Sequence, residues 1–195
     1  MRIRSVPWDF AIARTASDDP ARTAELLMND EAFAAFYQRT ARNLWAYVAK
    51  VSGNAALADD LVQESYLRFL TADLRDEGEV AYRQYLFKIA TNLLRDHWRR
   101  PSMSALENLP ERALPVQEAP RTDHLDQRAM LEAAFERMRP RDRQLLWLAH
   151  AESYSHREIA KITGLGETSI RLLLFRARKK LAKYLARSVE RGAGR

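Results

Sequence analysis

The stretch SHREIAKITGLGETSIRLLLFRAR, residues 155–178, contains two helix signals separated by a glycine turn. Ser155 followed by Glu158 fits a capping box, in which each side chain bonds an unpaired backbone amide at a helix start. Gly164 stands where a helix end favours positive φ, and a second helix starts near Gly166 to Thr168. Two helices joined by a short glycine-containing turn are typical of the helix-turn-helix motif, whose second helix enters the DNA major groove.

The apolar period of the second helix separates a buried face from an exposed one. Its inward positions, spaced by four, three and four residues, are Ile170, Leu174, Ala177 and Leu181. The outward face predicted to contact DNA begins near Thr168 and continues through Arg171, Leu172, Phe175, Arg176 and Lys179. The stretch taken alone is also compatible with an ordinary helical hairpin whose basic face is solvated.

Charge is distributed unevenly along the 195 residues. Residues 121–195 carry 17 Lys and Arg against 9 Asp and Glu, a net charge of +8, whereas residues 1–120 carry 15 against 17, a net charge of −2. A basic segment bearing a helix-turn-helix is what phosphate binding requires. The acidic remainder indicates a protein partner instead.

The composition disfavours several other classes of protein. The chain has no cysteine, which excludes disulfides and cysteine-ligated zinc, and its four histidines have no ligand-like spacing. We therefore expect no cofactor, no metal and no catalytic site. The sequence has no apolar run of membrane-spanning length and no secretory signal at its start, so we expect a cytoplasmic protein.

Four prolines between residues 101 and 120 interrupt a polar stretch that separates two helical regions. They favour an extended linker over a regular helix. We therefore predict an all-α protein with an N-terminal extension (1–25), a first domain (26–100), a linker (101–125) and a helix-turn-helix domain (126–188). In the first domain we expect helices near 29–51, 55–72 and 79–99, with the first break at Gly53-Asn54.

The segment LADDLVQESYLRFL, residues 57–70, predicts a helix with one apolar and one mixed face. The positions expected to face the core are Ala58, Leu61, Val62, Ser65 and Phe69. The opposite face carries Asp60, Gln63, Leu67 and Leu70. Leucines on an acidic face suit a partner helix that is partly basic, although exposed leucines also occur by accident.

The next helix contains AYRQYLFKIATNLLRDHWRR, residues 81–100. Its expected inner stripe is Tyr82, Leu86, Ile89, Ala90 and Leu93. Its expected outer face is Gln84, Lys88, Thr91, Asn92, Arg95 and Arg99, with Phe87 and Trp98 at the rim. Cations along one face can follow a nucleic-acid backbone, and amides can reach bases, so the line Lys88–Asn92–Arg95–Arg99 is a candidate DNA surface.

Three segments together resemble a bacterial extracytoplasmic-function sigma factor of the sigma-70 family. ADDLVQESYLRF is similar to the family's AEDLVQETFLRA-type motif, and YLFKIATNLLRDHWRR is similar to its WLFRIARNLALDHLRR-type segment. SYSHREIAKITGLGETSIRLLLFRARKKL resembles its LSYEEIAEILGVPVGTVRSRLHRARKKL-type helix-turn-helix. The similarity runs in order from about Glu31 to Leu185.

The resemblance implies a promoter-specificity subunit that is not an enzyme and that binds core RNA polymerase, through its clamp helices and flap, and promoter DNA. It implies polymerase docking by Asp60, Leu61, Gln63 and Glu64, to which the facing argument adds Leu67. It implies minus-ten DNA binding by Asn92, Asp96, Arg99 and Arg100, to which facing adds Lys88 and Arg95. It also implies that the polar loop from Asp73 to Glu79 captures a flipped base, and that the helix-turn-helix reads the minus-thirty-five element.

One departure from the family pattern concerns the recognition helix. Leu172-Leu173 stands where the family usually has Ser-Arg, so a hydroxyl contact is replaced by an apolar one, which a thymine methyl could accept. An exposed leucine there also fits a protein-covered helix. The alternative is therefore a sigma mimic, which keeps the fold to bind an anti-sigma factor without recognising a promoter; an anti-sigma factor is a candidate partner in either case.

Overall fold

The computed structural model describes residues 28–72, 78–99 and 123–193, and within these ranges it is entirely helical. This confirms the all-α prediction. The helices are α1 (Asp30–Ser52), α2 (Ala55–Leu70), α3 (Glu79–Arg99), α4 (Asp123–Glu136), α5 (Pro140–His150), α6 (His156–Thr163) and α7 (Glu167–Ala193). The N-terminal extension, residues 73–77 of the predicted base-capturing loop, Arg100 and nearly all of the expected linker lie outside the described residues.

The break between α1 and α2 is made by the two residues predicted for it. Gly53 closes α1 with a φ of 77° and donates its amide to the carbonyl of Ala49. The Asn54 side chain then accepts from the amide of Leu57 and so caps α2. Since a positive φ is strained for residues with a Cβ, glycine suits this helix end.

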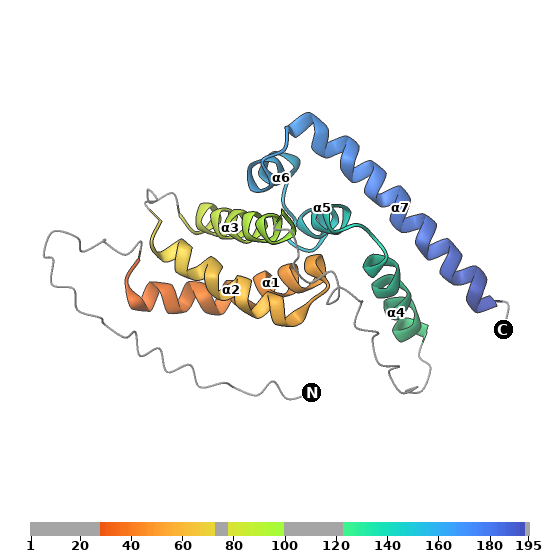
Figure 1. Ribbon diagram of the computed structural model, residues 1–195, viewed down its shortest axis with the longest axis horizontal. Helices are drawn as coiled ribbons and strands as arrows, with labels where there is room; N and C mark the ends of the chain where they lie inside the picture. Colours follow the sequence, from red (N-terminus) through yellow and green to blue (C-terminus); the bar gives the residue numbers. More distant parts are fainter. Residues whose placement is uncertain (1–27, 73–77, 100–122, 194–195) are drawn as a thin grey trace, which may run out of the picture.

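Helices α1, α2 and α3 pack together as the first half of the molecule (Figure 1). Phe36 of α1 stacks on Phe69 of α2 with ring centroids 5.0 Å apart, and both are buried. The predicted core residues Ala58, Val62, Ser65 and Phe69 are all buried. Tyr66 is buried as well, and a hydrogen bond to Thr40 at 2.7 Å satisfies its hydroxyl.

The second half contains the helix-turn-helix, formed by α6 and α7. The capping box of Ser155 and Glu158 is present, and Gly164 ends α6 with a φ of 68°, as predicted. Ile170, Leu174 and Ala177 are buried against the core. The long helix α7 runs along one side of the molecule and contacts α5 and α4 (Figure 1).

The two halves touch along a seam in which α5 contacts α1 and α6 contacts α3. The sequence did not predict this contact, and the division into domains at 26–100 and 126–188 stays a prediction. Two facing predictions for α3 are wrong because of the seam. Thr91 and Phe87, expected on the outer face and at the rim, are both buried. Helix α3 is covered by α1 and α2 on one side and by α6 on the other, so it has more than one buried face.

Candidate nucleic-acid and polymerase interface

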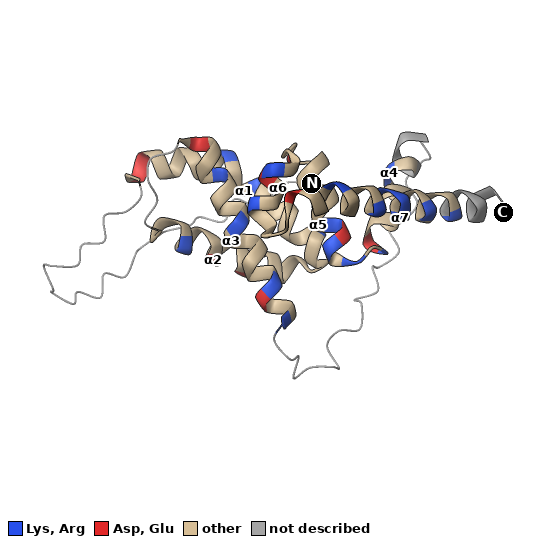
Figure 2. Cartoon of the chain, turned by 90° about the horizontal axis from the view of Figure 1, so that it is seen from above, with Lys and Arg blue, Asp and Glu red and all other residues tan. Residues whose placement is uncertain are grey.

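The predicted recognition face of α7 forms one continuous exposed surface. Its residues follow a spacing of three, one, three, one and three, which keeps them on a single side of a helix. They are Thr168, Arg171, Leu172, Phe175, Arg176 and Lys179, and all are exposed. Figure 2 shows that basic residues recur along the length of α7. The face therefore combines cations for phosphate or guanine with two large apolar side chains.

Leu172 and Phe175 form the apolar part of this face. They are 49% and 53% exposed, and because they stand three residues apart on one helix face they form a small apolar patch. The ammonium of Lys179 lies 4.8 Å from the centroid of the Phe175 ring, so the cation partly covers the aromatic face. Such a surface can contact a thymine methyl or an apolar partner.

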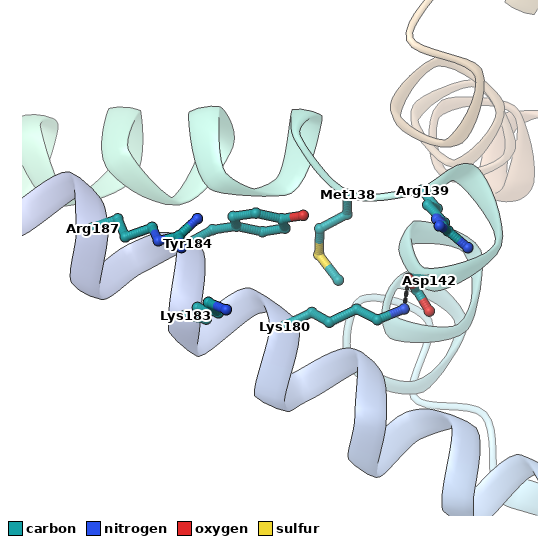
Figure 3. Close-up of a pocket in the computed structure, with 7 residues that line it drawn as sticks. All are labelled: Met138, Arg139, Asp142, Lys180, Lys183, Tyr184 and Arg187. Carbon is teal, nitrogen blue, oxygen red and sulfur yellow. Dashed lines mark hydrogen bonds and ion pairs between the residues drawn. The ribbon is translucent and has the colours of Figure 1, made fainter.

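A basic pocket on the second half is lined by α7, α5 and the loop between α4 and α5 (Figure 3). Lys180 of α7 reaches Asp142 of α5, with Nζ and Oδ2 2.6 Å apart. Beside this ion pair lie Met138 and the ring of Tyr184. The other residues that line the pocket are Arg139, Lys183 and Arg187. The ion pair ties α7 to α5 next to the recognition face, since Lys180 stands one helical turn after Arg176.

The candidate minus-ten face of α3 is only partly open. Lys88, Asp96 and Arg99 are exposed, whereas Asn92 and Arg95 are half-buried. Arg95 donates to the Asn92 side chain at 3.5 Å and to the carbonyl of Thr163 at 2.6 Å. Thr163 is the last residue of α6, where carbonyls lack helical partners and favour a cation. Arg95 thus joins the predicted minus-ten face to the helix-turn-helix.

A second pocket extends from this contact. Its lining comprises Thr91, Arg95, Trp98, Arg99, Arg141, Gln144, Thr163, Gly164 and Leu165. Sequence reasoning missed Arg141, which comes from α5 and brings a third guanidinium to the pocket. Arg141 follows Pro140 in an unremarkable polar run, so only its spatial neighbours reveal it.

The predicted polymerase-docking face lies on α2. Asp60, Gln63 and Leu67 are exposed, with Leu67 at 51%. Glu64 is half-buried and pairs with Arg68 at 2.6 Å. Leu61 is half-buried against the core, so it contributes packing more than contact surface. Leu70, expected to point outward, is half-buried too.

An exposed aromatic residue that the sequence analysis did not identify lies next to this face. Trp45 of α1 is 40% exposed, and its indole nitrogen donates to Asp59 at 2.7 Å. Asp59 immediately precedes Asp60, so the tryptophan extends the mixed face of α2 onto α1. Exposed aromatic residues of this kind are enriched at protein interfaces.

In the described ranges, no three side chains of His, Asp or Glu gather in a way that could hold a metal ion. Within the same ranges, no helix combines the length and the hydropathy needed to cross a membrane.

Both halves of the chain match known protein families. The family described as Sigma-70 region 2 matches residues 36–102, and Sigma-70, region 4 matches residues 128–181. These ranges contain the faces of α2, α3 and α7. The two regions in this order define a sigma factor of the sigma-70 type.

Similar proteins of known type show which group of sigma factors the chain resembles. The RNA polymerase sigma factor CarQ of Myxococcus xanthus is 28% identical over 156 residues, covering 80% of this chain and 90% of that protein. The ECF RNA polymerase sigma factor EcfG of Rhodopseudomonas palustris is 31% identical over 144 residues, covering 73% and 79%. The chain belongs to the extracytoplasmic-function RNA polymerase sigma factors.

A solved structure has the same fold. The sigma factor RpoE of Bartonella quintana, in complex with the anti-sigma factor NepR, matches with a TM-score of 0.62 at 20% identity. The match covers 80% of this chain and 98% of that one.

The shared exposed face of Asp60, Gln63 and Leu67 yields a prediction about polymerase docking. Asp60→Arg should weaken binding to core polymerase at least several-fold, roughly 1 kcal/mol or more, because a like charge replaces a complementary one. Helicity should not change, since the side chain is exposed. Fluorescence anisotropy of the labelled protein titrated with core polymerase measures this. Glu31→Arg, the same charge change at an exposed position of α1, is the control. Wild-type affinity in the Asp60 variant would contradict the assignment.

Proposed function

We propose that this chain is a promoter-specificity subunit whose first half docks on core polymerase and captures the minus-ten element, while α7 reads the minus-thirty-five element. The observation that carries the proposal is the pair of basic helix faces, on α3 and α7, in a chain whose regions 2 and 4 match in order. The chain performs no catalytic step itself, because the polymerase supplies the chemistry. Such a subunit acts in the bacterial cytoplasm, because the polymerase and the chromosome are there.

Each surface has a separate task in this proposal. The face of Asp60, Gln63, Glu64 and Leu67, backed by Leu61, meets the clamp helices of the polymerase. The second half meets duplex DNA and the polymerase flap. Since residues 26–100 and 126–188 are joined by one linker, binding of the first half makes the second contact intramolecular, with effective concentrations on the order of mM for short linkers.

The minus-ten residues divide by chemistry. Lys88, Arg95, Arg99 and Arg100 are suited to phosphates, which hold the strand without reading its sequence. The Asn92 amide can read a base edge. Asp96 can accept from an exocyclic amino group, as acidic side chains do with cytosine.

The proposal is tested by run-off transcription with purified core polymerase on a library of promoter fragments. Discrete start sites that depend on the added chain support it. A chain that binds core polymerase and yields no specific transcript from the library would overturn it.

The sigma-mimic alternative is kept because Leu172 and Phe175 are both about half exposed on the recognition face. A mimic would cover these side chains with a protein and would have no use for Arg171 and Arg176. The two readings therefore differ in which of these residues matter, and the recognition-helix variants below distinguish them.

For the minus-ten face, Arg99→Ala should lower promoter affinity with little change in sequence preference and reduce the salt slope by about one ion. Asn92→Ala should instead relax base preference or impair melting. Filter binding at several salt concentrations measures the first effect, and permanganate footprinting the second. Arg42→Ala, an exposed arginine on α1, is the control. If both variants open the promoter as the wild type does, this face does not bind DNA.

For the recognition helix, Arg171→Ala or Arg176→Ala should lower transcription from a cognate promoter roughly five- to hundredfold, since a bidentate arginine–guanine contact contributes about 1–3 kcal/mol. Leu172→Ser should have a modest effect or alter preference at one base pair, because an apolar contact to a methyl group is weaker.

Run-off transcription measures these variants, and Arg187→Ala, an exposed arginine further along α7, is the control. The sigma-mimic alternative would be favoured by two results together. Both arginine variants would transcribe as the wild type does, and Leu172→Ser would no longer bind a protein partner that the wild type binds.

A further inference from the structure

Trp45 of α1 and Asp59 of α2 form an exposed pair between the two helices. The indole N–H of Trp45 donates to Oδ1 of Asp59 at 2.7 Å, and 40% of Trp45 stays exposed. One turn to either side of Trp45, helix α1 carries Ala41 and Ala49, whose side chains are too short to cover a ring. The hydrogen bond therefore holds the indole by its edge, and the alanines leave ring surface accessible.

The Asp59 carboxylate has acceptor capacity left over. Within the described residues, its oxygens accept no hydrogen bond besides the indole N–H and take part in no ion pair. Asp59 is exposed, directly precedes Asp60 and stands one helical turn before Gln63. The pair of Trp45 and Asp59 is thus continuous with the polymerase-docking face of α2, which consists of Asp60, Gln63 and Leu67.

Two other accessible aromatic rings of the chain already hold a cation of their own. The ammonium of Lys179 lies 4.8 Å from the centroid of Phe175, and the guanidinium of Arg137 lies 5.6 Å from that of Tyr184. Among the described residues, no lysine or arginine occupies the corresponding place over Trp45. Tryptophan binds cations more strongly than the other aromatic side chains do. Trp45 is therefore open to a cation supplied by another molecule.

We propose that Trp45 and Asp59 bind an arginine side chain of the core polymerase, as a further docking point beside the face of α2. A guanidinium can stack on the indole and pair with the carboxylate at the ring edge at the same time, which a lysine ammonium does less well. Asp59 also acts as a positioning residue, because it holds the ring.

The polymerase is the occupant for two reasons. The pair extends the surface that the proposed function assigns to the clamp helices, and the inference rests on that assignment. The adjacent carboxylates of Asp59 and Asp60 also favour a partner that carries positive charge.

Substitutions at Trp45 separate cation binding from simple apolar burial. Trp45→Leu keeps a large apolar side chain and removes the ring, whereas Trp45→Phe keeps a ring that binds cations less strongly. The control is Leu131→Ala, which removes a 46% exposed apolar side chain of α4 outside the docking face. Fluorescence anisotropy of each labelled full chain, titrated with core polymerase without DNA, gives the affinity. Circular dichroism verifies that each variant keeps its helices.

The expected affinities follow the strength of the ring as a cation site. Trp45→Leu should weaken binding roughly five- to thirtyfold, the range for a cation–π contact that loses water on binding. Trp45→Phe should fall between Trp45→Leu and the wild type. The control should bind as the wild type does.

Two substitutions at Asp59 separate its roles. Asp59→Asn keeps an oxygen for the indole N–H and loses the charge, so it should weaken binding roughly two- to fivefold. Asp59→Ala loses both and should weaken binding further. In the free chain, the indole ¹H–¹⁵N resonance that Trp45→Phe removes should shift in Asp59→Ala and stay nearly in place in Asp59→Asn.

A double-mutant cycle tests whether the two side chains share one guanidinium. If they do, Trp45→Leu combined with Asp59→Ala should weaken binding by less than the product of the two single effects. Two independent contacts would give the full product, and that result would overturn the proposal.

Two further results would also overturn it. One is Trp45→Leu binding core polymerase as tightly as the wild type, and the other is Trp45→Phe binding no better than Trp45→Leu. Failure of the proposed function is distinguishable through Asp60→Arg. If Asp60→Arg weakens binding and Trp45→Leu does not, the docking face stands and the arginine site falls. Loss of both effects would remove the docking face as well, while run-off transcription by the wild-type holoenzyme reads promoter function separately.

Discussion

The buried hydroxyl of Tyr47 is the polar point on which three helices converge. It bonds Thr91 of α3 at 2.7 Å and accepts from Gln144 of α5 at 2.9 Å. Complete burial raises the pKa of Tyr47 to about 12, so the hydroxyl stays protonated and can donate. A buried hydroxyl without partners would cost free energy, and this requirement sets the register of α3 and α5 against α1. The orientation of the predicted minus-ten and recognition faces depends on that register.

Capping residues and apolar periodicity predicted where the helices begin and end. They did not predict which helices pack against one another. Gly53-Asn54 and the pair of Ser155 and Glu158 act within a few residues, so capping rules placed those helix ends correctly. The exposed face of α7 was also predicted, because this helix buries one stripe. Thr91 was wrongly predicted to be exposed, because the prediction assumed that α3 buries a single face and assigned the opposite face to solvent. Nothing in its local sequence reveals a second covering helix.

Helix α5, on the other side of the seam, also has buried residues that sequence periodicity does not predict. Asp142, Arg143 and Gln144 are consecutive polar residues, and all three are buried. A periodicity argument treats such a run as an exposed face. The run is buried because Asp142 pairs with Lys180, Gln144 bonds the first half, and Arg143 fits against Gly53. Only the tertiary arrangement supplies these partners, so the second pocket, which Arg141 helps to line, could not be predicted either.

The central claim is that the basic faces of α3 and α7 both contact promoter DNA when the chain is bound to core polymerase. The most direct measurement is crosslinking of promoter DNA by a photoreactive side chain placed at position 99 of α3 or at position 179 of α7 in the assembled holoenzyme. The account predicts crosslinks from position 99 to the minus-ten element and from position 179 to the minus-thirty-five element. A holoenzyme that opens the promoter while neither position crosslinks to DNA would contradict it.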